Sequence, residues 1–277
     1  MATPTLTRHQ VPGTLGPIEL DLRAARRDTP APAVVLVHGF KGFKDWGFFP
    51  ATAERLARAG FTSVAIDLSG SGVERGEFTR PERFFRNTHR AEAADLAAVL
   101  DALQGGALDL APPTSVGLLG HSRGGASVLA NAGRPGVGAL VTWAAIASVL
   151  RWDQATRARW RTEGRLDVVN TRTGQVLPVG LELLEEVERE HDGALDLERL
   201  AEAVAVPWLI VHGTEDESVS FLDAELLAEA SDRPGTKLLA IEGAGHTFGV
   251  AHPWVGPAPM FDRTLSETLE WFARHLV

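Results

Sequence analysis

The sequence predicts an α/β fold, with a mostly parallel, doubly wound sheet and helices on both of its faces. Six short apolar runs are spread along the chain, and segments with helical periodicity separate them. Near-continuous apolar runs are typical of strands that are covered on both faces, as in a parallel sheet. Alternating strands and helices favour right-handed crossovers, and the functional residues of such sheets gather at the carboxyl ends of the strands.

Each predicted strand is a run made mainly of aliphatic residues. The predicted strands cover 33–37, 62–66, 115–119, 139–143, 207–211 and 236–241. The predicted helices place apolar residues three or four positions apart, which gives each helix one apolar face. They cover 51–59, 89–103, 122–132, 221–230 and 263–276.

One segment, from about 147 to 205, interrupts this alternation and is more polar than its surroundings. Its expected elements are a helix at 152–163, two short strands within 168–177 that turn at Thr173-Gly174, and an acidic helix at 181–191. We interpret residues 1–277 as a single domain in which this insertion is a small lid over the strand ends. The alternative is a surface decoration with no role in binding.

Composition excludes several classes of function. The chain has no cysteine, so disulfides, thiolate metal sites and a cysteine nucleophile are all ruled out. A net charge of −9 argues against nucleic acid and anionic membrane surfaces as partners. No apolar run approaches the ~20 residues that span a bilayer, and the N-terminus lacks the apolar core of a secretory signal. We expect a cytoplasmic protein; the sequence leaves its oligomeric state open.

The stretch from Gly120 to Gly124, with the sequence GHSRG, joins a predicted strand to a helix rich in small residues. A serine in such a sharp strand-to-helix turn has a strained backbone, which requires small residues two positions before and after it. The two glycines meet this requirement. The turn also places the hydroxyl at a helix N-terminus, where backbone N–H groups stabilise negative charge. Ser122 is therefore the candidate nucleophile.

A serine nucleophile needs a base, and the base needs an orienting acid. His246 follows the last predicted strand in a loop with glycines on both sides, so its ring is free to project over the sheet edge. A histidine used only for packing or capping is the alternative. His252 competes for the role of base, but it lies farther from the strand end and precedes Pro253.

Asp216 follows the predicted strand at 207–211, where its carboxylate could reach the far nitrogen of His246. Glu215 and Glu217 flank it, so the alternative is a solvated acidic loop in which no residue is special. The chain order Ser122, Asp216, His246 is nucleophile, acid, base. It matches one of the three known triad orders and excludes the other two.

The predicted first strand ends at His38-Gly39-Phe40. The backbone N–H of Phe40 and that of Arg123 are the expected oxyanion hole, two donors directed at one reaction centre. His38 is expected to brace this loop by hydrogen bonding rather than to titrate in catalysis.

These motifs resemble those of the α/β-hydrolase fold superfamily, over about residues 18–276. Residues 67–72 (DLSGSG) resemble its D-x-x-G-x-G loop, and 38–44, 121–125 and 246–248 are most similar to the dienelactone-hydrolase-like and cinnamoyl-esterase-like branch. Dienelactone hydrolases use cysteine, so serine here shifts the expectation toward esterases. The resemblance implies a carboxylic-ester hydrolase that acts on a small-molecule ester and needs no metal or organic cofactor. No pair of histidines has zinc-ligand spacing with a partnered acid, so we predict no metal site.

Two other functions compete with an esterase. One is an aminopeptidase or amidase for short peptides or aminoacyl amides, because acids crowd the 181–191 helix and could hold a free amino terminus; a solvated helix face is the simpler explanation. The other is a catalytically silent binding protein on the same fold.

Substrate preference is less determined by the sequence. The aromatic residues after the first strand either line an apolar pocket or pack in the core; they are Phe40, Phe43, Trp46, Phe48 and Phe49. Lys41, Lys44 and Arg123 could contact an anionic substrate, although pairing with Asp45 and nearby acids is the simpler expectation.

Overall fold

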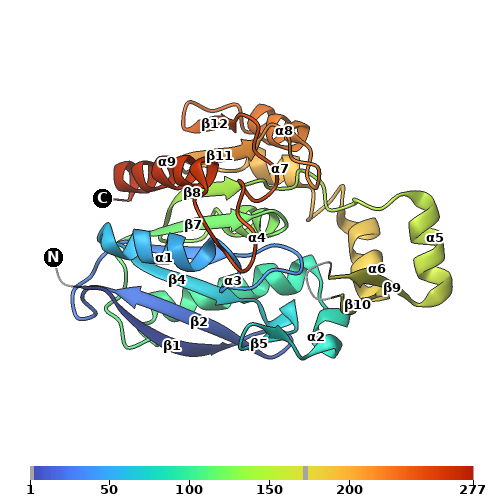
Figure 1. The fold of residues 1–277 in the computed structure, drawn as a ribbon, viewed down its shortest axis with the longest axis horizontal. Coiled ribbons are helices and arrows are strands. Elements are labelled where there is room, and N and C mark those ends of the chain that lie inside the picture. Colours follow the sequence, from blue (N-terminus) through green and yellow to red (C-terminus); the bar gives the residue numbers. More distant parts are fainter. Residues whose placement is uncertain (1–2, 171–173, 277) are drawn as a thin grey trace.

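A computed structural model describes residues 3–170 and 174–276 of the chain. Within this part, eight strands form one twisted sheet in the order β1-β2-β4-β3-β7-β8-β11-β12 (Figure 1). Their bounds are β1 Thr5–Pro12, β2 Pro17–Ala24, β3 Ala33–Val37, β4 Thr62–Asp67, β7 Val116–His121, β8 Val137–Trp143, β11 Trp208–Gly213 and β12 Thr236–Ile241. All six predicted strands are present, and most differ from the predicted bounds by one or two residues.

The sheet is parallel from β4 to β12, and β1 and β2 add an antiparallel edge. The mostly parallel sheet confirms the predicted fold class. The two edge strands were not predicted from the sequence. β1 is largely exposed, so its residues lack the continuous apolar run that marks the inner strands.

Helices cover both faces of the sheet, as predicted. Two separate clusters of buried side chains show this, one on each face. On one face lie α1 (Phe49–Arg58) and α9 (Pro259–His275), whose buried residues include Leu56 and Phe272. On the other lie α3 (His89–Gln104), α4 (Gly124–Asn131) and α8 (Phe221–Ser231).

Smaller elements connect β4 to α3. They are a 3-10 turn at Ser69–Ser71, the two-residue strands β5 (Val73–Glu74) and β6 (Glu77–Phe78), and α2 (Pro81–Phe85). Three helix bounds differ from the prediction for local reasons. Both α1 and α9 begin earlier, each with a proline in its first turn, where the missing N–H costs nothing. The helix predicted at 122–132 begins at Gly124, because Ser122 belongs to the preceding turn.

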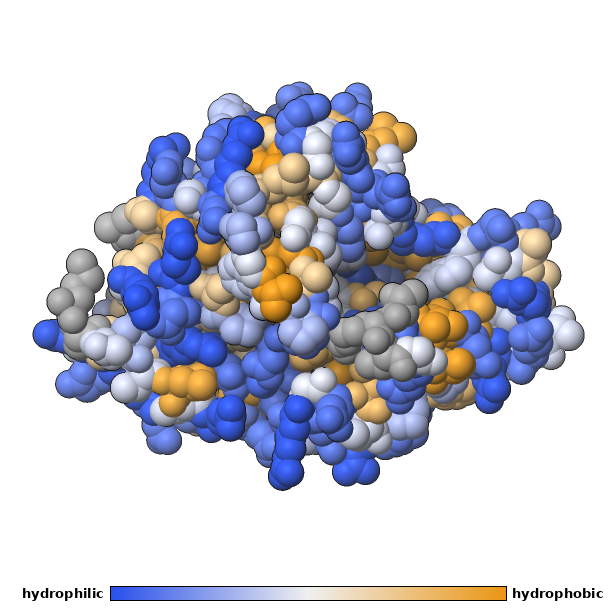
Figure 2. All heavy atoms as spheres, in the orientation of Figure 1, coloured by the Kyte–Doolittle hydropathy of each residue, from blue (hydrophilic) through white to orange (hydrophobic). Residues whose placement is uncertain are grey.

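The segment at about 147–205 projects from the body beside the carboxyl ends of the strands (Figure 1). It contains α5 (Gln154–Glu163), β9 (Arg165–Val169), β10 (Val176–Gly180), α6 (Leu181–Glu190) and α7 (Leu197–Glu202). β9 and β10 pair antiparallel, and Thr173 of the predicted turn lies outside the described residues. Figure 2 shows hydrophobic atoms on this projecting segment; two of its valines, Val169 and Val176, are each 52% exposed.

α7 was not predicted. It returns the chain to the body, where it packs against α8. A search of the described helices for one long and apolar enough to cross a bilayer found no candidate.

Candidate active site

Ser122 lies in the turn between β7 and α4, with a backbone φ of 56°. A positive φ is strained for a residue that has a side chain, and such strain persists only where the surroundings hold it in place. Here the Ser122 N–H donates to the Trp143 carbonyl at 2.8 Å, which ties the turn to β8. The serine therefore has the backbone geometry that its sequence context predicts.

The glycines around this turn are required by packing. A Cβ on Gly120 would lie 2.5 Å from the Gly124 carbonyl oxygen, and one on Gly124 would lie 2.6 Å from the backbone oxygens of Val37 and His38. Both distances are shorter than contacts that real side chains make. The close approach of α4 to the end of β3 brings Ser122 next to the His38-Gly39-Phe40 loop.

Asp216 and His246 meet at the ends of β11 and β12. The Nδ1 of His246 lies 2.8 Å from Oδ2 of Asp216, and the ring is partly exposed while the carboxylate is buried. The other carboxylate oxygen, Oδ1, accepts the backbone N–H groups of Ser218 and Val219 at 2.8 and 2.9 Å. Glu215 and Glu217 are exposed, so burial distinguishes Asp216 from its acidic neighbours.

The charge of Asp216 is stabilised by these contacts. Burial alone would raise its pKa, but hydrogen bonds from His212, from His246 and from the Val219 N–H outweigh it and hold the pKa far below its usual range. The carboxylate therefore stays ionised throughout the neutral range.

Two histidines that sequence reasoning missed support this pair. His212 is fully buried, and its Nε2 lies 3.0 Å from the Val219 carbonyl and 3.3 Å from Oδ2 of Asp216. His121 directs Nε2 toward the His246 carbonyl at 3.1 Å, and burial lowers its pKa to about 3. The available signal was their position: each lies at the carboxyl end of an apolar strand, His121 directly before Ser122 and His212 four residues before Asp216.

His252 has a different environment from His246. Its Nδ1 accepts the Gly47 backbone N–H at 2.9 Å, and its ring stacks on Trp46. Of the two, His246 is the one in contact with the buried carboxylate.

The backbone around Gly39 lies directly against the Ser122 turn. A Cβ on Gly39 would come within 2.8 Å of the Ser122 Cβ and 3.3 Å of the Arg123 nitrogen. In the described part of the chain, no hydrogen bond of the Phe40 or Arg123 backbone N–H to another group is found. His38 braces the loop from behind: Nδ1 contacts the Gly39 carbonyl and Nε2 accepts the Leu68 N–H. Burial lowers the pKa of His38 to about 4, so the ring is neutral.

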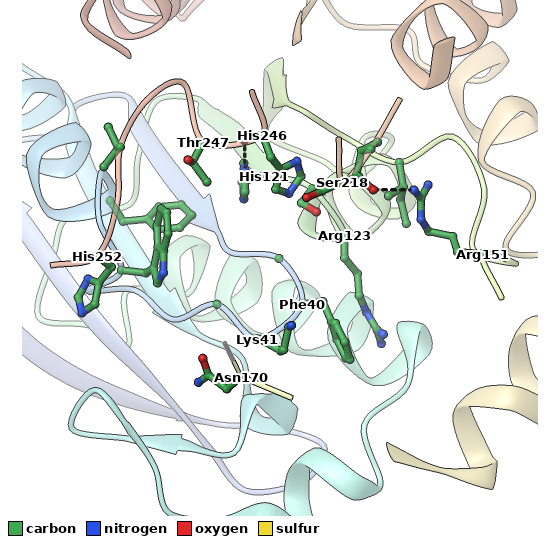
Figure 3. A pocket seen from close by; sticks show the side chains of 18 of the residues that line it. Phe40, Lys41, His121, Arg123, Arg151, Asn170, Ser218, His246, Thr247 and His252 are labelled. Carbon is green, nitrogen blue, oxygen red and sulfur yellow. Dashed lines mark hydrogen bonds between the residues drawn. The ribbon is translucent and has the colours of Figure 1, made fainter. Parts of the chain in front are cut away.

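A cavity of about 820 Å³ opens above Ser122. Figure 3 shows Thr247, His246 and Ser218 along one side of it and Asn170, Lys41, Phe40 and Arg123 along the other. The face in Figure 2 is hollowed where the projecting segment leaves the body. Four lining residues come from the 147–205 segment: Val149, Arg151, Trp152 and Asn170. No hydrogen bond between the Ser122 hydroxyl and the His246 ring is present among those of the described residues, although both line this cavity; such bonds are often long before substrate binds.

The aromatic cluster divides between the two predicted roles. Phe40 and Trp46 line the cavity, Phe43 and Phe48 are buried in the core, and Phe49 is a core residue that also reaches the cavity wall. Among the described residues, no group of three or more His, Asp or Glu side chains is arranged to hold a metal ion.

Comparison with known proteins identifies the family. A family model described as "Alpha/beta hydrolase family" matches residues 34–258. The chain belongs to the alpha/beta hydrolase family. This membership agrees with the resemblance drawn from its motifs.

Individual relatives of this chain are distant. A curated relative, "2,6-dihydropseudooxynicotine hydrolase" of Paenarthrobacter nicotinovorans, is 24% identical over 231 residues, which are 82% of this chain and 56% of the relative. The chain thus spans little more than half of that protein.

Solved structures share its fold. Est1E from Butyrivibrio proteoclasticus aligns with a TM-score of 0.67 at 19% identity, over 96% of this chain and 99% of Est1E. A dienelactone hydrolase from Anabaena variabilis aligns with a TM-score of 0.64 at 18% identity, over 99% and 100% of the two chains.

Proposed function

We propose that this hydrolase cleaves carboxylic esters of small molecules through an acyl-enzyme on Ser122. The observation that carries the proposal is the 2.8 Å contact between His246 and the buried Asp216, beside a cavity that Ser122 also lines. A histidine held by a buried carboxylate next to a strained serine is the arrangement that serine hydrolases use on several unrelated folds.

The proposed reaction follows from these positions. Neutral His246 takes the hydroxyl proton as Ser122 attacks the ester carbonyl, and Asp216 stabilises the imidazolium that forms. The backbone N–H groups of Phe40 and Arg123 bind the oxyanion. His246 then returns its proton to the departing alcohol. Water attacks the acyl-enzyme in the same way and releases the acid.

An amidase receives less support from the structure. Three of the five acids of α6 that suggested one have other partners: Glu186 accepts backbone N–H groups of α3, Glu188 pairs with Arg157 and Arg161, and Glu190 with Arg90 and Arg189. No acid of α6 is among the described residues that line the cavity. Comparison of 4-nitrophenyl butyrate with butyryl 4-nitroanilide measures the preference directly, and faster anilide turnover would favour the amidase.

Labelling with a fluorophosphonate separates an enzyme from a silent binding protein. We expect covalent modification at Ser122, loss of labelling in Ser122→Ala, and a fall of roughly 10³-fold or more in kcat for ester hydrolysis. Ser218→Ala is the matched control, because Ser218 lines the same cavity and its bond to Asp216 comes from the backbone N–H, which alanine keeps. Near-normal turnover in Ser122→Ala would rule out the proposed nucleophile.

A further inference from the structure

The lining of the cavity has a charge opposite to that of the whole chain. Three described lining residues are cationic, Lys41, Arg123 and Arg151, and no described lining residue is Asp or Glu. The chain as a whole carries a net charge of −9. A cavity of one sign concentrates ligands of the other sign.

Among the described lining residues, Lys41 is the cation for which no counter-ion is found. It is half-buried, its Nζ donates to the Val169 carbonyl at 3.2 Å, and none of the ion pairs among described residues includes it. Burial lowers its pKa, and no nearby carboxylate opposes that effect. Lys44 shows the contrast: its Nζ lies 3.2 Å from Asp21 and pairs with Asp45 as well. Pairing therefore explains Lys44, as expected from the sequence, and leaves Lys41 unexplained.

Arg123 offers a second, partly used donor group. Its side chain is only about 6% exposed, and Nε pairs with the equally buried Glu92 at 2.9 Å. Its Nη2 atom is buried and has no hydrogen-bond partner. The guanidinium lies over the Phe40 ring, 5.4 Å from the ring centroid. Buried donors are nearly always satisfied, so an unpartnered one at the wall of a cavity indicates a ligand atom.

The third cation already has an ion-pair partner and a hydrogen-bond acceptor. Arg151 pairs with Asp223 and donates to the Ser218 carbonyl. Figure 3 shows Lys41, Phe40 and Arg123 along the side of the cavity that faces His246. A substrate with its ester carbonyl at Ser122 would extend past His246 and Phe40. It would then reach the donor groups of Lys41 and Arg123.

We propose that the ester cleaved here carries a carboxylate, which Lys41 Nζ binds with Arg123 Nη2 as a further donor. This inference rests on the proposed function, since it assigns the substrate class of the same site. Glu92 already balances much of the Arg123 charge, so Lys41 supplies the net attraction. A neutral ester leaves the Lys41 charge without a counter-ion and Arg123 Nη2 without an acceptor.

The test compares two esters of similar length, the mono-4-nitrophenyl ester of adipic acid and 4-nitrophenyl hexanoate, with spontaneous hydrolysis subtracted. We expect kcat/KM to favour the anionic ester, and Lys41→Met to lower the anionic-to-neutral ratio roughly tenfold or more. Lys41→Arg should restore most of the preference. Lys237→Met is the matched control, because Lys237 carries the same charge on β12 and pairs with Glu267 outside the cavity.

The outcomes separate the two proposals. A wild-type enzyme that hydrolyses both esters without preferring the anionic one overturns the carboxylate site alone, as does an unchanged ratio in Lys41→Met. Failure to hydrolyse either ester, without fluorophosphonate labelling, overturns the proposed function and this inference together. If Lys41→Met does not fold, competitive inhibition of the wild type decides: adipate should inhibit better than adipamide, and less so at about 500 mM than at 50 mM NaCl.

Discussion

At the scale of single residues, Asp216 shows how hydrogen bonds stabilise a buried charge. Its two oxygens share contacts with two backbone N–H groups and two histidine rings. An ionised carboxylate taken out of water is costly unless such partners satisfy it. The same contacts fix the direction of the carboxylate, so that one oxygen faces the His246 ring.

Removal of this charge should be far more damaging than removal of its neighbours. We expect Asp216→Asn to lower kcat for ester hydrolysis on the order of 10⁴-fold, because the amide favours the wrong tautomer of His246. Glu215→Gln and Glu217→Gln are matched controls, since both side chains are exposed. A dead Glu217→Gln enzyme beside an active Asp216→Asn enzyme would show that the orienting acid is misassigned.

Gly124 offers a second test, of packing rather than charge. A Cβ at this position would collide with backbone oxygens of β3 and the following loop. We expect Gly124→Ala to lower the free energy of unfolding by ~1–3 kcal/mol and to impair turnover by shifting the Ser122 turn. Gly133→Ala is the control, because nothing lies within 4 Å of its Cβ position. Urea denaturation measures both; equal stability would contradict the packing argument.

At the scale of elements, a buried carboxylate helps to hold the projecting segment against the body. Glu186 of α6 accepts the backbone N–H groups of His89 at 2.7 Å and Arg90 at 3.2 Å. These are the first residues of α3, whose N-terminal N–H groups have no partners within the helix. The carboxylate also meets the positive end of the α3 dipole. The acid therefore stabilises α3 and holds α6 against it.

Loss of this contact should loosen the segment. We expect Glu186→Ala to lower the free energy of unfolding by about 2 kcal/mol or more, because a buried and a partly buried backbone donor lose a charged acceptor. The 147–205 segment should also become more sensitive to limited proteolysis. Glu185→Ala, which alters the exposed face of the same helix, should behave like the wild type. Equal proteolysis of the two variants would exclude Glu186 as the anchor.

At the scale of the whole molecule, buried histidines link stability to pH. His38 has its pKa lowered to about 4, chiefly by burial, and His121 to about 3, while an unfolded histidine titrates near 6.5. Below about pH 6.5 these histidines bind protons in the unfolded chain but stay neutral in the folded chain. The free energy of unfolding therefore decreases as the pH falls, until the pH reaches the histidine pKa in the folded protein. Asp67 has the opposite effect on the pH dependence of stability, because burial raises its pKa to about 7.

A difference between variants isolates the contribution of His38. Gln at position 38 can still accept the Leu68 N–H but does not titrate. Between pH 6.5 and about 4, the wild type should lose about 3 kcal/mol more stability than His38→Gln, at 1.36 kcal/mol for each unit of pKa shift. Urea unfolding across this range measures the difference. Parallel pH profiles would mean that His38 is not held neutral in the folded protein.

Local sequence determined most strands of the sheet and the turn at Ser122. Five of the six predicted strands could be predicted because they lie inside the sheet, where both faces are covered and almost every residue is buried. β12, at the edge of the sheet, could be predicted from its own apolar run, although it is only partly buried. The Ser122 turn could be predicted because only glycines fit two residues on either side of it. β1 and β2 escaped prediction, because β1 is largely exposed and β2 alternates apolar with charged residues, so neither has a continuous apolar run.

Tertiary structure alone decided which polar residues share an environment. The sequence names His246, Asp216 and Ser122, but it cannot show that Asp216 is buried while Glu215 and Glu217 are exposed. Nor can it show that Lys44 meets Asp21 while Lys41 lies on the cavity wall without an acid. Those differences come from contacts between segments far apart in the chain, and charge and burial at a site are set by such contacts rather than by neighbours in sequence.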